Sequence, residues 1–223
     1  DIRVVMPLYP SVAKTGARLE KVFGSMCVHM GGTEEWCVVY RTVLDGGLPV
    51  FFIEHERFFG RLPLYHDAAM NDYPDNPARY AFLCRAALQL CRDDGFSPHI
   101  IHGNDWQTAP AAAYAKTWHW DDPLLGRAAS VLTIHNHLFQ GIYPPSWYDY
   151  LGLGWEHFNA HAFESYGKIN FLKGGIRFAE VVTTVSPGYA RETTTPYDPG
   201  GLAPYLSDKG DDYIGILNGV DYT

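Results

Sequence analysis

The sequence predicts an α/β protein built on a doubly wound, mostly parallel sheet. Strand-like and helix-like segments alternate through most of the 223 residues. The strand-like segments after residue 100 are continuous apolar runs, which are typical of parallel strands covered on both faces. Hydrophobic residues make up 47% of the chain and charged residues 19%, which excludes a disordered or collagen-like protein. We expect residues 1–223 to form one domain, without repeats, low-complexity tracts or a linker.

The amino-terminal part predicts strands, a hairpin and a long loop. Residues 2–6 (Ile-Arg-Val-Val-Met) form a short strand that a proline ends, and a loop follows. Residues 36–43 and 50–53 form two strands joined through an Asp-Gly-Gly turn, which is a hairpin signal. Residues 55–77 are rich in Gly, Pro, Asp, Asn and aromatic residues. They predict a long loop, and long loops in compact domains are usually functional.

Helices and strands then alternate to the end of the chain. The first helix begins at Asp75 or Asn76 with a proline in its first turn, and Gly95 ends it. The following elements are expected, in this order: a strand at 100–101, a helix at 108–118, a strand at 131–134, a helix at 171–178, a strand at 181–185, a helix from Ser186-Pro187 and a strand at 214–217.

The charge and cysteine content of the chain argue against some partners and predict its redox environment. Seventeen Lys and Arg against 25 Asp and Glu give a formal net charge of −8, which argues against nucleic acid or an anionic membrane as a partner. No apolar run is long enough to span a bilayer, and the first residues lack the pattern of a signal peptide. The four cysteines form no CxxC pair, so we expect reduced thiols in a cytosol-like compartment.

Polar side chains follow three of the predicted strands, at the point where each strand ends. They are His102, Asp105, Trp106, Gln107 and Thr108 after the first, His135, Asn136, His137 and Gln140 after the second, and Asn218 and Asp221 after the last. Ligands of open α/β sheets bind at the carboxyl ends of the strands, so we expect these side chains to share one site. Aromatic faces beside carboxylates, amides and imidazoles suit a sugar, because a flat ring packs on C–H groups while polar atoms bind hydroxyls.

Each residue also has a plain structural interpretation. Asp105 can cap the following helix, Trp106 can be a packing residue, and His135 can be structural. Asn136 and Asn218 can be turn residues that tolerate left-handed backbone.

Several other functions lack their motifs. The chain has no GxGxxG turn for a dinucleotide, no GxxxxGK[ST] phosphate loop and no GxSxG nucleophile elbow. A zinc site at His102, His135 and His137 lacks HExxH or CxxC spacing, so we expect no metal and no cofactor.

Nine segments, in the same order along the chain, resemble segments of the bacterial glycogen synthases and plant starch synthases. They are Asp-Ile-Arg-Val-Val-Met-Pro-Leu-Tyr at 1–9, Phe-Phe-Gly-Arg at 58–61, Asn-Asp-Tyr-Pro-Asp-Asn at 71–76, Gly-Asn-Asp-Trp-Gln-Thr at 103–108, Thr-Ile-His-Asn-His at 133–137, Gln-Gly-Ile-Tyr-Pro-Pro at 140–145, Ile-Asn-Phe-Leu-Lys-Gly-Gly at 169–175, Thr-Thr-Val-Ser-Pro-Gly-Tyr-Ala-Arg-Glu at 183–192 and Gly-Ile-Leu-Asn-Gly-Val-Asp at 215–221. The resemblance covers nearly the whole chain.

The resemblance implies a Rossmann-like half of a two-domain GT-B glycosyltransferase. Such enzymes transfer glucose from ADP-glucose to the 4-hydroxyl at the non-reducing end of an α-1,4-glucan, with retention and without a metal. It implies catalytic roles for Asp105 and His135. The substrate-binding residues that it implies are Tyr73, Trp106, Gln107, Asn136, Gln140 and Asn218. The family usually has histidine at the positions of Gln107 and Asn104, and glutamine cannot carry charge.

The resemblance also bears on the ends of the chain. Family members have an earlier strand followed by Lys-Thr-Gly-Gly-Leu, and a second domain that grips the donor diphosphate. We therefore expect a second domain in cis and an inactive isolated chain, and we interpret Lys14-Thr15-Gly16 as a coincidental match. The location implied is cytoplasmic, or plastid in a plant or alga. The alternative is a non-catalytic glucan-binding or scaffold protein, and the absence of a glycine fingerprint disfavours a nucleotide-sugar epimerase or dehydrogenase.

Overall fold

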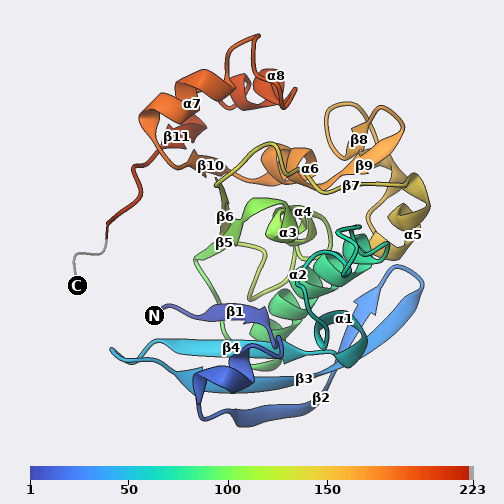
Figure 1. Cartoon of the computed structure of the whole chain (residues 1–223), viewed down its shortest axis with the longest axis vertical. Helices are drawn as coiled ribbons and strands as arrows, with labels where there is room; N and C mark the ends of the chain where they lie inside the picture. The colour runs from blue at the N-terminus through green and yellow to red at the C-terminus, as the bar shows by residue number, and fades with distance from the viewer. Residues whose placement is uncertain (221–223) are drawn as a thin grey trace. The chain divides into compact units, whose positions relative to one another are not determined.

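The computed structural model describes residues 1–220, and the chain forms two compact units (Figure 1). Unit 1 consists of residues 1–90 and 149–152, and unit 2 consists of residues 91–148 and the chain from Leu153 onward. Each unit has its own sheet, and helices alternate with strands along the chain, so the predicted α/β class is confirmed. That residues 1–223 act as one domain stays a prediction. No helix within residues 1–220 combines the length and the apolar character needed to cross a bilayer.

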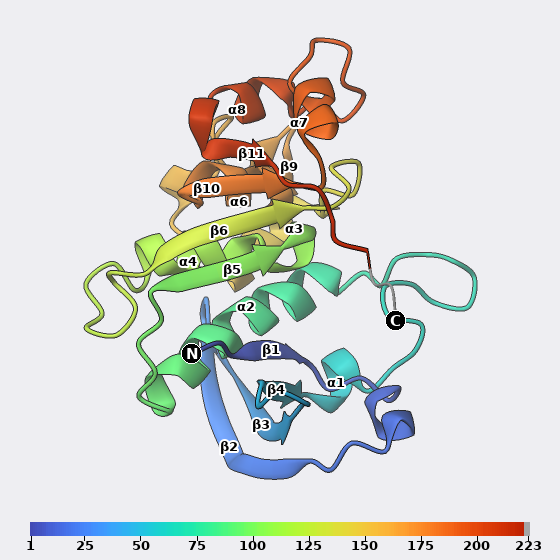
Figure 2. The ribbon, with the colours of Figure 1, turned by 90° about the vertical axis from the view of Figure 1, so that its left-hand side faces the viewer.

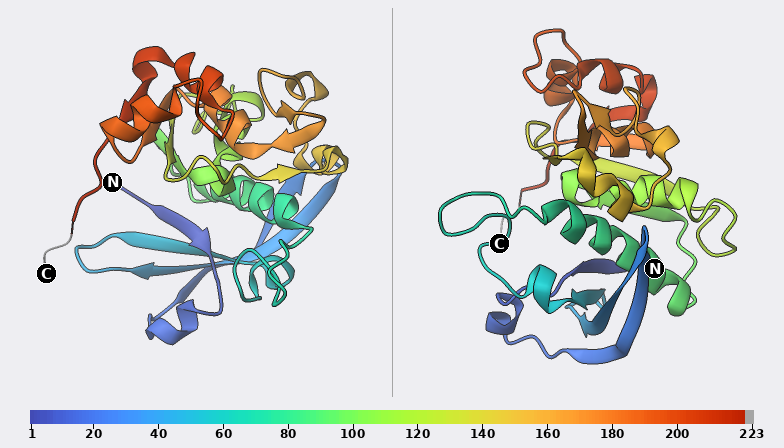
Figure 3. Two further views of the ribbon diagram at one scale, coloured as in Figure 1. Left: turned by 45° about the horizontal axis from the view of Figure 1, so that its top comes forward. Right: turned by 90° about the vertical axis from the view of Figure 1, so that its right-hand side faces the viewer.

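Unit 1 is built mainly from strands. Its elements are β1 (Val4–Pro7), the 3-10 turn η1 (Val12–Thr15), β2 (Glu20–Met30), β3 (Thr33–Val43), β4 (Pro49–Glu54), α1 (Glu56–Phe59), most of α2 (Asn76–Asp93) and most of α5 (Tyr148–Leu151). The sheet order is β1-β4-β3-β2, with β1 parallel to β4 and the other two pairs antiparallel. The predicted hairpin over β3 and β4 is confirmed. The loop expected between Pro7 and Trp36 is wrong in part, because it contains β2, which pairs with β3 in a long hairpin (Figure 3).

The long loop after β4 is held from the inside by one arginine. Arg79 of α2 is fully buried and donates hydrogen bonds to the main-chain oxygens of Phe58 and Leu64, at 2.6 and 2.9 Å. It also donates to the side-chain oxygen of Asn76 at 2.6 Å, and its guanidinium lies 5.2 Å from the ring centroid of Tyr73. A guanidinium offers five N–H groups in a fixed plane, so it can bind several acceptors at once. The predicted loop at 55–77 is therefore ordered, and it begins with α1.

Unit 2 contains the parallel sheet that the apolar runs predict. Its elements are β5 (Ile100–Asn104), α3 (Asp105–Thr108), α4 (Pro110–Thr117), β6 (Ala129–Ile134), β7 (Ile142–Tyr143), η2 (Pro145–Trp147), η3 (Trp155–His157), β8 (Glu164–Ser165), β9 (Lys168–Asn170), α6 (Phe171–Phe178), β10 (Val181–Thr184), α7 (Pro187–Thr193), α8 (Ala203–Ser207), η4 (Gly210–Asp212) and β11 (Tyr213–Gly215). The strands β11-β10-β6-β5 lie side by side and all pairs are parallel (Figure 2). Strands β7, β9 and β8 form a small antiparallel sheet.

Local sequence explains where these helices begin. Asn170 caps α6, because its side-chain oxygen accepts the main-chain N–H of Lys173 at 2.9 Å. Ser186 caps α7 in the same way through the N–H of Tyr189, at 3.0 Å. The helix predicted at about 108–118 is confirmed as α4, which starts at Pro110, whose ring suits a first helical turn. The short helix α3 precedes it and was not predicted.

Candidate active site at the carboxyl ends of β5 and β6

Asp105 and His135 meet at the edge of the unit 2 sheet. Asp105 follows β5 and His135 follows β6, and these two strands are hydrogen-bonded neighbours. The Oδ1 atom of Asp105 accepts the main-chain N–H of His135 at 2.7 Å. The Nε2 atom of His135 lies 3.0 Å from the side-chain oxygen of Asn104. The sheet thus brings the two predicted catalytic residues together, and Asn104 orients the imidazole.

The backbone of Asp105 is held in an unusual conformation. Its φ is 55°, in the left-handed region that residues with a Cβ seldom adopt, although aspartate tolerates it better than most. Such conformations cost on the order of 1 kcal/mol and persist where the surrounding structure fixes them. Asp105 is the first residue of α3, whose N-cap position is Asn104, and the N-cap position of α4 is Ala109. The capping interpretation is therefore wrong, because the carboxylate binds His135 instead.

A row of polar side chains crosses three neighbouring strands close to this pair. The Nε2 atom of His102 on β5 lies 2.7 Å from the hydroxyl of Thr133 on β6, which lies 2.7 Å from the hydroxyl of Thr183 on β10. Partial burial and the nearby His135 lower the pKa of His102, so its neutral form is favoured. The sequence argument missed the two threonines. They are identified by the strand register, which pairs Thr133 directly with Thr183 and which the sequence alone does not give.

Trp106 lies beneath the edge rather than on it. It is 8% exposed and packs against the rings of Tyr143 and Phe171, with centroid distances of 5.7 and 6.4 Å. Gly141 covers it so closely that a Cβ there would lie 2.6 Å from the indole Cε3 atom. The structure gives Trp106 a packing role, and its contact with a glucan stays a prediction.

Gln140 and His137 hold the segment around residue 200 to the chain after β6. Gln140 is buried, donates to the main-chain oxygen of Gly200 at 2.7 Å and accepts from the amide of Asn170 at 2.6 Å. His137 is buried between the hydroxyl of Tyr189 and the carboxylate of Asp198. Both side chains are engaged within the protein, so a sugar contact of Gln140 stays a prediction, and His137 does not join His102 or His135.

Among the other predicted binding residues, Asn136 and Tyr73 make side-chain contacts with residues other than Asp105 and His135. Asn136 is exposed and its side-chain oxygen accepts the N–H of Leu138 at 3.0 Å, which forms the expected turn. Gln107 is half-buried in α3, and Asn218 is exposed beyond β11. Tyr73 belongs to unit 1, where its ring faces the guanidinium of Arg61 at 4.3 Å. Asp221 lies outside the described residues. Substrate binding by these residues stays a prediction.

Fold and site together define an α/β domain with a carboxylate–histidine pair at the carboxyl edge of a parallel sheet. Comparison with known proteins gives its family. The profile of the starch synthase catalytic domain matches residues 1–208. The chain belongs to this family.

Named relatives agree with that assignment. Glycogen synthase 1 of Geobacter sulfurreducens (strain ATCC 51573 / DSM 12127 / PCA) is 44% identical over 224 residues, covering 100% of this chain and 44% of that protein. Glycogen synthase of Anaeromyxobacter sp. (strain Fw109-5) is 41% identical over 221 residues, covering 99% and 45%. A solved structure, the catalytic domain of starch synthase IV from Arabidopsis thaliana bound to ADP and acarbose, matches with a TM-score of 0.87 and 31% identity. It covers 98% of this chain and 44% of that one, so the chain spans less than half the length of these relatives.

Proposed function

We propose that this chain supplies the glucan-binding half of a retaining glucosyltransferase. The reaction is transfer of glucose from ADP-glucose to the 4-hydroxyl at the non-reducing end of an α-1,4-glucan. The observation that carries the proposal is the 2.7 Å contact between the Asp105 carboxylate and the His135 main chain, in a chain of the starch synthase catalytic domain family. The relatives matched over the whole chain are named glycogen synthases, which supports a nucleotide-sugar donor and a glucan acceptor.

The geometry gives each of the two residues a chemical role. One oxygen of Asp105 is held by the His135 N–H, while the other has no protein partner within residues 1–220 and can accept a sugar hydroxyl. When Nε2 of His135 donates to Asn104, its Nδ1 is left as the acceptor in the neutral ring. Glycosyl transfer passes through a transition state with positive charge on the sugar ring. A carboxylate and an imidazole that are already fixed in place stabilise that charge without reorganising.

The second half of the catalytic site is proposed to come from a further domain in cis. The relatives are more than twice as long as the part that this chain matches. We propose that this domain binds the nucleotide diphosphate of the donor, while unit 2 presents the acceptor glucan and the reacting carbon to Asp105 and His135.

The test is transfer of labelled glucose to maltoheptaose by an active polypeptide that contains this sequence. Replacing Asp105 by alanine should lower turnover by on the order of 10² or more, as expected when a fixed contact to the transition state is lost. The matched control is Asp45→Ala, in the exposed turn between β3 and β4, which should leave turnover unchanged.

Two results would contradict the proposal. Unchanged turnover in Asp105→Ala would remove this residue from the reaction. Glucan binding without any transfer in the intact polypeptide would favour a non-catalytic glucan-binding protein. Running the assay with UDP-glucose beside ADP-glucose identifies the donor.

A further inference from the structure

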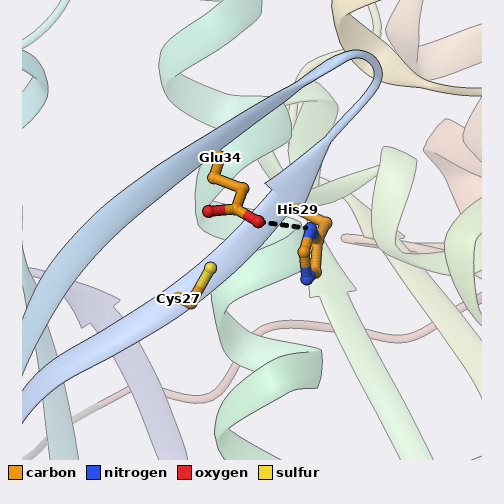
Figure 4. Close-up of side chains that lie close together, drawn as sticks. All are labelled: Cys27, His29 and Glu34. Atoms are coloured by element: carbon orange, nitrogen blue, oxygen red, sulfur yellow. Dashed lines mark ion pairs between the residues drawn. The ribbon is translucent and has the colours of Figure 1, made fainter.

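Three side chains with metal-binding atoms project from the β2–β3 hairpin of unit 1, far along the sequence from the Asp105–His135 pair. They are Cys27 and His29 on β2 and Glu34 on β3 (Figure 4). One ligand atom of each lies within 4.8 Å of the others, and the Nδ1 atom of His29 lies 3.6 Å from Glu34 Oε1. Within residues 1–220, no other group of three such side chains comes together in this way.

The hairpin places these side chains on one face by its register. Cys27 and His29 are two residues apart on one strand, so both point to the same side. His29 and Glu34 are directly opposite each other across the antiparallel pair. Met26, Val28 and Met30 alternate with them and are almost fully buried on the other face. The core therefore directs all three ligands outward.

The backbone that carries the ligands is also fixed. The Nε atom of the buried Arg85 donates to the main-chain oxygen of His29 at 3.1 Å. Next to Glu34, the carboxylate of Glu35 is held by Arg57 at 2.7 Å and by the hydroxyl of Tyr150 at 3.0 Å. These contacts hold the two strands through atoms other than the three ligand atoms.

We propose that Cys27, His29 and Glu34 bind a Zn²⁺ ion, with solvent at its fourth position. Thiolate, imidazole and carboxylate are all ligands of zinc, whereas Ca²⁺ and Mg²⁺ prefer sites made only of oxygen atoms. In a tetrahedral zinc site, ligand atoms lie about 3.3–3.8 Å apart. The present spacing, up to 4.8 Å, is close to that, and His29 and Glu34 are 61% and 53% exposed, so their side chains can move. On binding, the Cys27 thiol releases its proton to solvent and the sulfur becomes a charged ligand.

The experiment titrates the full chain, kept reduced, with Co²⁺ as a visible substitute for Zn²⁺. We expect a thiolate-to-cobalt absorption band and its displacement by added Zn²⁺. Cys27→Ser should abolish the band. His29→Asn and Glu34→Gln should weaken metal binding by about tenfold or more, since the loss even of a partner outside the ligand set costs about that much.

Matched controls test whether the signal belongs to this cluster. Cys91→Ser removes the other half-buried thiol, and Glu20→Gln removes an exposed carboxylate of the same strand; both should keep the band. Circular dichroism checks folding, and if Cys27→Ser unfolds, the exposed Glu34→Gln variant decides. Absence of the band at saturating Co²⁺, its persistence in Cys27→Ser, equal affinity in Glu34→Gln or its loss in Cys91→Ser would overturn the proposal.

Discussion

At the scale of single residues, Asp105 combines a left-handed φ with a carboxylate that binds the His135 main chain. Asparagine would tolerate the same backbone, and alanine would not, so the two substitutions separate backbone strain from charge. A loss of turnover shared by both variants points to the carboxylate. A loss of stability confined to alanine points to the conformation.

His102 makes stability depend on pH. Burial and the neighbouring His135 lower its pKa, whereas in the unfolded chain it titrates near its ordinary value of about 6.5. Around and below that value the unfolded chain binds a proton that the folded chain resists, so the free energy of unfolding falls as the pH decreases through about 6.5. His102→Asn should reduce this decrease, measured by urea denaturation at several pH values.

The control for this prediction is His161→Asn, which changes an exposed imidazole of the same unit. It should leave the pH dependence as in the unmodified chain. An unchanged slope in His102→Asn would show that His102 does not couple folding to protons. His55 of unit 1, whose pKa is lowered by burial against the opposing effect of Glu35, contributes in the same direction and remains in both variants.

Which residues stand at the site edge could be predicted only in part. The rule that parallel strands end at one edge correctly brought Asp105 and His135 together. The same rule placed Trp106 and Gln140 there. However, Gly141 packs directly on the Trp106 indole, and the Gln140 side chain donates to the main-chain oxygen of Gly200. Sequence order cannot show this, because it depends on how later segments pack on the strand ends.

At the scale of elements, helix α6 packs closely on Ala109 and Leu132 through Gly175. A Cβ at Gly175 would lie 2.5 Å from the Cβ of Ala109 and 2.9 Å from Leu132 Cδ2. Gly175→Ala should therefore lower the free energy of unfolding by about 1–3 kcal/mol, because the crowded core must shift. Thermal unfolding of the variant measures the effect as a lower Tm.

Gly188 in helix α7 provides the matched comparison. The nearest atom to a Cβ there is Ser186 Oγ, at 3.8 Å, so alanine fits without a clash. Gly188→Ala should raise stability by about 0.4–1 kcal/mol, because alanine restricts the unfolded chain. A higher Tm in Gly175→Ala than in Gly188→Ala would contradict the close packing of α6.

The strands of the parallel sheet and the longer helices were predictable from local sequence, whereas β2 and the short elements β7, β8, β9, α5 and α8 were not. The apolar runs of β6 and β10 and the capped starts of α6 and α7 follow directly from periodicity and cap residues. Strand β2 was missed because its pairing with β3 shifts register twice between Lys21 and Met26. Such irregularities break the alternation that identifies a strand. The Cys27–His29–Glu34 cluster lies on that strand and its partner, and it depends on the β2–β3 pairing that was not predicted.

At the scale of the whole molecule, the family of the chain and the share of its relatives' length that it spans predict how the isolated chain behaves. Because the chain spans about 44% of the length of its relatives, we expect it to bind maltoheptaose weakly and not to turn over ADP-glucose. Isothermal titration with maltoheptaose and a labelled-glucose assay measure the two properties. Turnover of ADP-glucose by the 223-residue chain alone would show that no second domain is needed.

Arg79 has a consequence for how the 58–64 loop can evolve. Two of its partners, the oxygens of Phe58 and Leu64, belong to the main chain, which every amino acid supplies. A substitution at either position leaves the acceptor in place, so these two hydrogen bonds to α2 do not depend on the side chains at 58 and 64. The fully buried rings of Phe58 and Phe59 still restrict which residues the segment accepts, so its path depends on these rings as well as on the Arg79 guanidinium.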